Sequence, residues 1–160
     1  MSELGARLEA AVDAMLAEVA MLPDELIGWK PAADVWSVME ILCHVDEFVP
    51  YWTGQALQIV KQPDEQWGRT HAHAGRLEAV GRAESRSLAD VTNTIRIGAR
   101  ESAAAIDQLR DSDLAAEAVS RNPRWGKKPA SFVIHDLVIG HVEKHLGQIR
   151  RNVMQFHALR

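Results

Sequence analysis

Apolar residues recur at intervals of three and four along most of the chain, a pattern typical of amphipathic helices. The pattern covers residues 2–22, where Pro23 ends it, and residues 37–60, 88–109 and 132–157. No stretch alternates between apolar and polar residues for long enough to predict a β-strand. Four amphipathic helices of this length predict an all-α fold, a four-helix bundle.

Capping residues mark where two of these helices should begin. Ser37 is followed three residues later by Glu40, the spacing of a capping box. Ser131 is the expected N-cap of the last helix. Pro50 lies inside the second helix, where it removes one backbone hydrogen bond and is expected to bend the helix.

Two of the segments that connect these helices are long. Residues 63–84 contain three glycines and few large apolar side chains, so we expect a loop that acts as a lid or as a crossover. Residues 23–36 form a connector rich in turn-forming residues. Its large apolar side chains are expected to lie against the core: Leu26, Ile27, Trp29 and Trp36.

The composition is that of an ordinary globular protein. At 160 residues, with 47% apolar and 25% charged residues, we expect residues 1–160 to form one domain. Cys43 is the only cysteine, so an internal disulfide is excluded. No apolar run is long enough to span a membrane, and the first residues lack the basic region of a signal peptide, so a cytoplasmic protein without membrane contact is expected.

Charge is distributed unevenly along the chain. Residues 1–119 hold 10 Lys and Arg against 20 Asp and Glu (net −10), whereas residues 120–160 hold 8 against 2 (net +6). The overall charge is −4 and the basic residues are not interleaved with aromatic ones, so we expect no nucleic-acid binding. The basic segment is interpreted as packing beside acidic helices.

Three histidines are candidate metal ligands. His141 and His145 are four residues apart, so their imidazoles leave the same face of the last helix. Each lies next to an apolar position of that helix, and His44 lies similarly on the second helix. Three imidazoles from two helices could converge on a metal site with at least one open coordination position, as catalytic sites have. The alternative is that each is a hydrogen-bonded core residue, which is the commoner role of a lone histidine near an apolar face.

The remaining histidines and the cysteine are interpreted more simply. His71 and His73 are expected to be solvated loop residues, although their spacing would also allow metal binding. His135 falls off the proposed face, and His157 lies near the C-terminus. We interpret Cys43 as a small buried residue.

Two segments carry a resemblance to a known family. Trp36 to Val45 resembles the WSxxExxxH signature of the DinB-like superfamily, and His141 to Arg150 resembles its HxxxHxGQI signature. Trp125 and Gly126 match a tryptophan-glycine loop between them. One departure is Leu146, because some relatives carry a second histidine at that position.

The resemblance implies a DinB-like four-helix bundle, often a homodimer, with a divalent metal such as zinc or nickel on His44, His141 and His145. Related families include isomerases and S-transferases that use a low-molecular-weight thiol. Glu40, one turn before His44, and Gln148, three residues after His145, could face the same cavity as catalytic residues, although Glu40 could equally serve only as a cap.

The leading functional hypothesis is a metal-dependent transferase, isomerase or hydrolase that acts on a small electrophilic molecule. Basic residues before the last helix could receive the carboxylates of a thiol: Arg121, Arg124, Lys127 and Lys128. The alternative is a non-catalytic, stress-associated metal-binding protein that forms oligomers.

Overall fold

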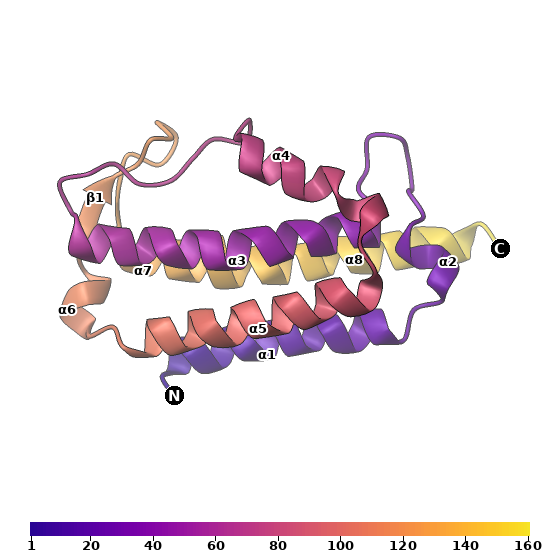
Figure 1. The fold of residues 1–160 in the computed structure, drawn as a ribbon, viewed down its shortest axis with the longest axis horizontal. Coiled ribbons are helices and arrows are strands. Elements are labelled where there is room, and N and C mark those ends of the chain that lie inside the picture. The colour runs from indigo at the N-terminus through magenta and orange to yellow at the C-terminus, as the bar shows by residue number, and fades with distance from the viewer.

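Four long helical segments form the body of the molecule (Figure 1). The computed structural model describes residues 1–160. The segments are α1 (Glu3–Ala20), α3 (Val38–Lys61), α5 (Leu88–Asp107), and a composite helix of α7 (Ala130–Phe132), the π-helical η2 (Val133–Ile139) and α8 (Gly140–Ala158). The predicted all-α four-helix bundle is therefore confirmed, with helix ends within about two residues of the predicted ones.

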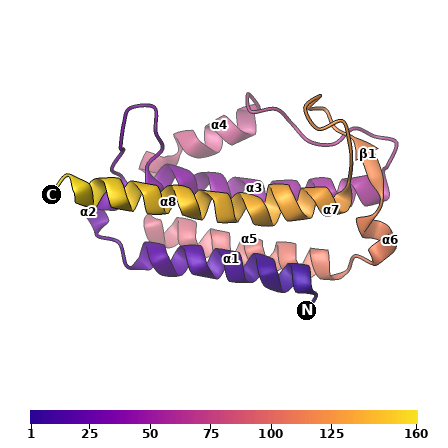
Figure 2. The ribbon, with the colours of Figure 1, turned by 180° about the vertical axis from the view of Figure 1, so that it is seen from behind.

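The directions of the helices explain the long connection in the middle of the chain. α3 and α5 run one way and pack side by side, whereas α1 and α8 run the other way (Figures 1 and 2). Two consecutive long helices that are parallel need a connection that returns along the bundle. Residues 62–87 make that return, so the predicted crossover is confirmed.

The crossover contains more regular structure than the sequence predicted. It includes α4 (Ala74–Gly81), which packs on α3, and the 3₁₀ turn η1 (Ala83–Ser85). The prediction of a loop was wrong here because a short helix with no fully buried side chain leaves no clear apolar stripe.

Short elements close the ends of the bundle. They are α2 (Asp24–Ile27), α6 (Asp111–Leu114) and two antiparallel strands, β1 (Glu117–Val119) and β2 (Lys127–Pro129). The sequence predicted no strand, and three-residue strands are too short to show an alternating pattern. The strands return the chain from α5 to the start of α7.

The predicted caps are confirmed in one case and wrong in the other. The Ser37 hydroxyl accepts the Glu40 amide at 3.1 Å, and the Glu40 carboxylate accepts the Ser37 amide at 2.8 Å, which completes the capping box. Ser131 does not cap the last helix, because that helix begins at Ala130, directly after Pro129. α3 continues through Pro50 as one helix.

The core fills the space between the four long segments. Leu26 and Ile27 of the connector are buried in it, and Trp29 and Trp36 pack against it, as predicted. None of the helices is both long and apolar enough to cross a membrane.

Candidate metal centre

The three predicted histidines meet on one side of the bundle. His44 projects from α3, and His141 and His145 project from the antiparallel α8. One potential ligand atom from each residue lies within 4.8 Å of the other two. His44 and His145 are only 2% and 6% exposed, whereas His141 is partly exposed.

A π-helical turn immediately precedes the histidine pair. The Gly140 amide donates to the His135 carbonyl five residues earlier, as in a π-helix. A Cβ atom at position 140 would lie 2.9 Å from that carbonyl oxygen, so glycine suits this close approach. The turn leads directly into α8, which carries both histidines.

Aromatic rings hold the imidazoles in place. Phe48, one turn after His44, stacks on His141 with ring centroids 4.0 Å apart and planes 20° apart. Trp36 stacks on His145 at 6.2 Å and meets His44 edge-on at 5.1 Å. These contacts restrict ring rotation and exclude water from one side of the cluster.

Each imidazole has a buried nitrogen with no hydrogen-bond partner. These atoms are Nδ1 of His44, Nδ1 of His141 and Nε2 of His145. The other nitrogen of His145, Nδ1, lies 2.8 Å from the side-chain oxygen of Gln148. An amide oxygen only accepts, so His145 carries its proton on Nδ1 and directs the lone pair of Nε2 into the cluster.

Burial keeps all three rings neutral. Desolvation, followed by the charges of neighbouring groups, lowers the pKa of His44 from 6.5 to about 2. Burial likewise lowers the pKa of His141 to about 3 and that of His145 to about 4. Neutral imidazoles keep a lone pair at neutral pH, which is the form that binds metal.

The donor set fits a divalent transition metal. Buried polar atoms in native proteins nearly always have partners, and each one without costs about 1 to 3 kcal/mol. Three neutral, fixed imidazoles, each with a potential ligand atom within 4.8 Å of the other two, are what a single cation would satisfy. Imidazole nitrogen suits zinc, nickel, copper and iron alike.

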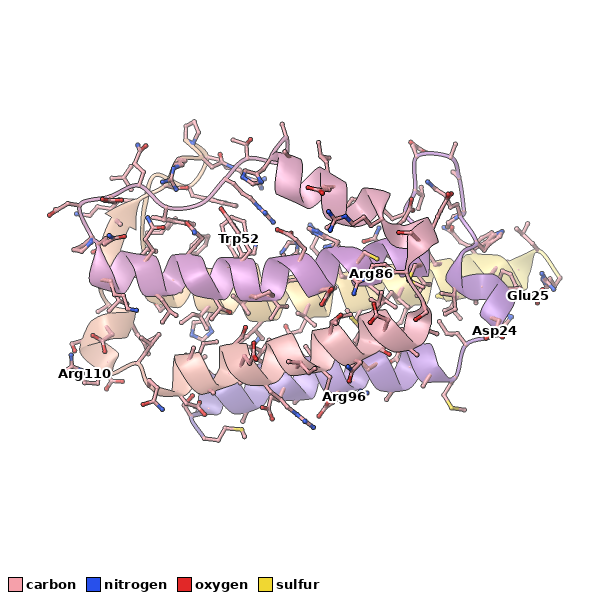
Figure 3. The ribbon with its side chains drawn as sticks, in the orientation of Figure 1. Asp24, Glu25, Trp52, Arg86, Arg96 and Arg110 are labelled. Atoms are coloured by element: carbon pink, nitrogen blue, oxygen red, sulfur yellow. The ribbon has the colours of Figure 1, made fainter.

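The cluster opens into a cavity of about 370 Å³. Its walls come from α3, the crossover, the segment between β1 and β2, and the composite helix. Trp52, which points from α3 toward the segments lying over it, forms part of one wall (Figure 3). A cavity of this volume accommodates a small molecule beside the histidines.

Basic side chains line the cavity in excess of acidic ones. The lining contains one acidic residue, Asp136, and four basic ones: Arg69, Arg76, Arg124 and Lys144. Arg69 is paired with Glu47 of α3 through two hydrogen bonds, one of 2.6 Å. Both neighbouring carboxylates of α3 are thus ion-paired: Glu47 holds Arg69, and Asp46 accepts from Arg86 at 2.7 Å, where Arg86 lies between α3 and α5 (Figure 3).

The two predicted catalytic residues lie in different places. Gln148 contacts His145 directly. The Glu40 carboxylate serves the capping box and lies 3.5 Å from the Lys30 ammonium, and Glu40 is not part of the cavity lining. The structure thus gives Glu40 a capping role, and its catalytic role stays a prediction.

The four basic residues proposed from the sequence separate in space. Arg124 lines the cavity, but Arg121 donates to the Gly68 carbonyl at 3.3 Å, and Lys128 lies over the Phe132 ring at 4.9 Å. Lys127 is exposed on β2. Only Arg124 of this group therefore faces the histidines.

The remaining histidines and the cysteine lie apart from the cluster. His73 accepts from the Gly75 amide as the cap of α4, and His71 is exposed at the cavity wall. His135 and His157 are exposed. Cys43 is buried, as predicted, and burial raises the pKa of its thiol.

Sequence reasoning missed Arg69 and Arg76 as cavity residues. Both lie in the crossover, where no periodic pattern says which face meets α3. It placed Trp36 against the core and in the family signature, but it did not predict that this ring contacts two of the histidines.

The model of the DinB superfamily matches residues 7–149. The chain belongs to the DinB superfamily. No functionally curated protein is detectably similar to it in sequence.

Two solved structures share the DinB fold seen here. YfiT from Bacillus subtilis, described as a probable metal-dependent hydrolase with an unusual four-helix bundle topology, has a TM-score of 0.80 at 10% identity, covering 98% of this chain and 90% of YfiT. The mycothiol-dependent maleylpyruvate isomerase has a TM-score of 0.72 at 11% identity, covering 92% of this chain. This chain spans only 59% of the isomerase, and at such identities the likeness concerns the fold alone.

Proposed function

We propose that this protein is a metal-dependent enzyme that binds a divalent ion, zinc or nickel, through His44, His141 and His145. The observation that carries the proposal is the set of three imidazoles whose potential ligand atoms lie within 4.8 Å of one another beside an open cavity. A purely structural metal would not need a cavity large enough for a substrate.

The proposed reaction is thiol-dependent transfer or isomerisation, or hydrolysis, of a small electrophilic molecule. A bound divalent ion would supply Lewis acidity and lower the pKa of a water or thiol ligand toward neutrality. The hydrolase and mycothiol-dependent isomerase that share the fold support these two reaction classes.

The residues of the chain provide the setting for this chemistry. Gln148 fixes the proton of His145 on Nδ1, while Trp36 and Phe48 hold the rings and keep water from their far side. The Asn152 amide donates to the Trp36 carbonyl at 2.8 Å, so α8 also positions the segment that carries the indole. A fixed, dry set of ligands reduces reorganisation when substrate binds.

Elemental analysis of the purified protein tests the metal site. The chain and a His135→Ala control should retain about one equivalent of a divalent metal, whereas His44→Ala should retain far less. His135 is exposed on the neighbouring turn, so the control removes an imidazole without touching the cluster. Equal metal content in His44→Ala and the control, with matching circular dichroism spectra, would refute the site.

Turnover distinguishes an enzyme from the non-catalytic alternative. The metal-loaded protein should transfer glutathione, bacillithiol or mycothiol to 1-chloro-2,4-dinitrobenzene, or hydrolyse 4-nitrophenyl acetate, and His44→Ala should do neither. Stable metal retention with neither activity would favour the non-catalytic, oligomeric protein. A homodimer remains part of the proposal, and light scattering on the eluting protein measures it.

A further inference from the structure

Arg76 is a cation in an unusual position. It projects from α4 into the cavity wall, is only partly exposed, and appears in none of the nine ion pairs of the structure. Its Nη1 donates to the His71 carbonyl at 3.2 Å, and its guanidinium carbon lies 5.2 Å from the centre of the Trp36 ring. Trp36 itself touches His44 and His145, so Arg76 lies close to the cluster.

The surroundings of Arg76 do not neutralise its charge. Burial and the positive charge of Arg69 lower the pKa of Arg76, which means that the protonated form is destabilised where it sits. Arg69 forms an ion pair with Glu47, whereas no carboxylate forms an ion pair with Arg76, and the charge of Glu47 offsets only part of the lowering of the Arg76 pKa. A half-buried guanidinium with five donors and one carbonyl partner leaves donors free for an anion.

The opposite end of the cavity is aromatic. Trp52, Trp125 and Phe132 line it, with Trp52 and Trp125 5.7 Å apart and Trp125 and Phe132 6.3 Å apart. Trp67 stacks behind Trp125 with planes 4° apart, and its Nε1 donates to the Ala118 carbonyl at 2.9 Å. The wall is therefore backed by a fixed indole.

Helix direction places these two ends on either side of the histidines. Trp36, whose ring lies against the Arg76 guanidinium, comes just before the start of α3, whereas Trp52 follows His44 by eight residues, or about 12 Å along α3. Because α8 is antiparallel to α3, Phe132, before His141, lies toward the Trp52 end. A ligand that reaches from the aromatic wall to Arg76 must pass the three imidazoles.

We infer that the substrate is a small carboxylate with a planar apolar body, bound with its carboxylate on Arg76 and its body against Trp52, Trp125 and Phe132. The inference rests on the proposed function, because it places the bond that reacts beside the histidines. Arg124 and Lys144 also line the cavity but are exposed, and the nearby Asp136 offsets part of their charge. They make the cavity more positive, and we assign neither of them as the specific partner of the carboxylate.

Binding of simple probes tests this substrate class without relying on turnover. Cinnamate, its uncharged counterpart cinnamamide, and acetate would be titrated into the full chain by calorimetry, as purified and after treatment with a chelator. Cinnamate should bind in both forms, about tenfold more tightly than cinnamamide, because it gains a charge-assisted hydrogen bond. Acetate should bind far more weakly than cinnamate, since it cannot cover the aromatic wall.

Two substitutions assign the contacts. Arg76→Gln should reduce the affinity for cinnamate about tenfold and leave that for cinnamamide unchanged, whereas Arg96→Gln, on the exposed face of α5, should change neither (Figure 3). Trp125→Leu should weaken cinnamate and cinnamamide alike. Equal binding of cinnamate and cinnamamide, or equal effects of Arg76→Gln and Arg96→Gln, would overturn the inference.

A thiol cofactor could also bring a carboxylate, so glutathione is titrated in parallel. Loss of cinnamate affinity in Arg76→Gln with unchanged glutathione affinity assigns the arginine to the substrate. A response seen only with glutathione would overturn that assignment. Because the chelated protein is also titrated, the cinnamate measurement stays valid even if the protein binds no metal. If the protein binds metal but does not prefer cinnamate over cinnamamide, the inference about the substrate is refuted while the proposed metal site stands.

Discussion

Nδ1 of His145 lies 2.8 Å from the side-chain oxygen of Gln148, one helical turn further along α8. The contact fixes which nitrogen of the ring is protonated and leaves Nε2 free to bind a cation. Gln148 is therefore a positioning residue, which acts on the site through the imidazole it holds.

Replacing Gln148 should weaken metal binding. Gln148→Leu removes the acceptor, so His145 no longer favours the Nδ1-protonated form, and the metal affinity should fall about 10- to 100-fold. Gln148→Glu keeps an oxygen at the same place and should retain the affinity. Competition with a chromogenic chelator measures both. Gln155→Leu, exposed on the same helix, is the matched control, and an affinity of Gln148→Leu equal to it would contradict the role.

The metal-free protein should lose stability as the pH falls below about 6.5. In the unfolded chain His44, His141 and His145 bind protons near pH 6.5, but burial lowers their pKa to about 2, 3 and 4 in the folded chain. The unfolded state therefore binds more protons between pH 6.5 and 4, so acid favours it. Each such histidine contributes up to about 1.4 kcal/mol per pH unit within that window.

Urea unfolding between pH 7 and 5 checks this pH dependence. The window lies above the usual titration range of carboxylates, so the buried histidines dominate it. His145→Phe should show a shallower decline than the unmodified chain, whereas His135→Asn, an exposed position, should match it. A stability that does not change from pH 7 to 5 would contradict the buried, neutral state of the cluster.

The π-helical turn gives a prediction about glycine. Gly140→Ala would bring a Cβ atom to 2.9 Å from the His135 carbonyl oxygen, which is backbone and cannot move aside freely. We expect a loss of about 1 to 3 kcal/mol and a weaker metal site, since the strain lies next to His141. Gly147→Ala is the control: its new methyl group would come no closer than 3.8 Å to the Arg151 side chain, and alanine favours the helix. Chemical denaturation that ranks the two variants equally would show that the turn tolerates a side chain.

The sequence predicted the parts of the site that follow helical periodicity. His141 and His145 share a face because they are four residues apart, and Ser37 with Glu40 located the start of the helix that carries His44. Ser131 was wrongly predicted as the N-cap, because the helix begins one residue earlier, next to Pro129. The spacing of apolar residues also could not predict the π-helical turn that follows. Long-range contacts were equally hidden. Arg76 meets Trp36 only because the crossover folds back over α3, a consequence of two parallel helices that the apolar pattern could not specify.

The ion pair between Glu47 and Arg69 should hold the crossover on the bundle. Arg69 is 6% exposed, and its guanidinium also lies 3.7 Å from the centre of the Tyr51 ring, so it cannot easily find water if its partner is removed. Glu47→Gln would leave this buried charge without a carboxylate and should cost about 2 kcal/mol or more, less than for a fully enclosed pair because Glu47 is partly exposed.

Glu78→Gln provides the comparison for Glu47→Gln. Glu78 pairs with Arg82 on the surface, where both side chains are more than half exposed, so its loss should change stability by at most about 0.5 kcal/mol. Hydrogen exchange adds the local test: Glu47→Gln should speed amide exchange over residues 69–76 more than elsewhere, since those residues lose their anchor to α3. Because the same segment carries Arg76, exchange that stays uniform while cinnamate affinity is kept would show that contacts other than this ion pair hold the crossover in place.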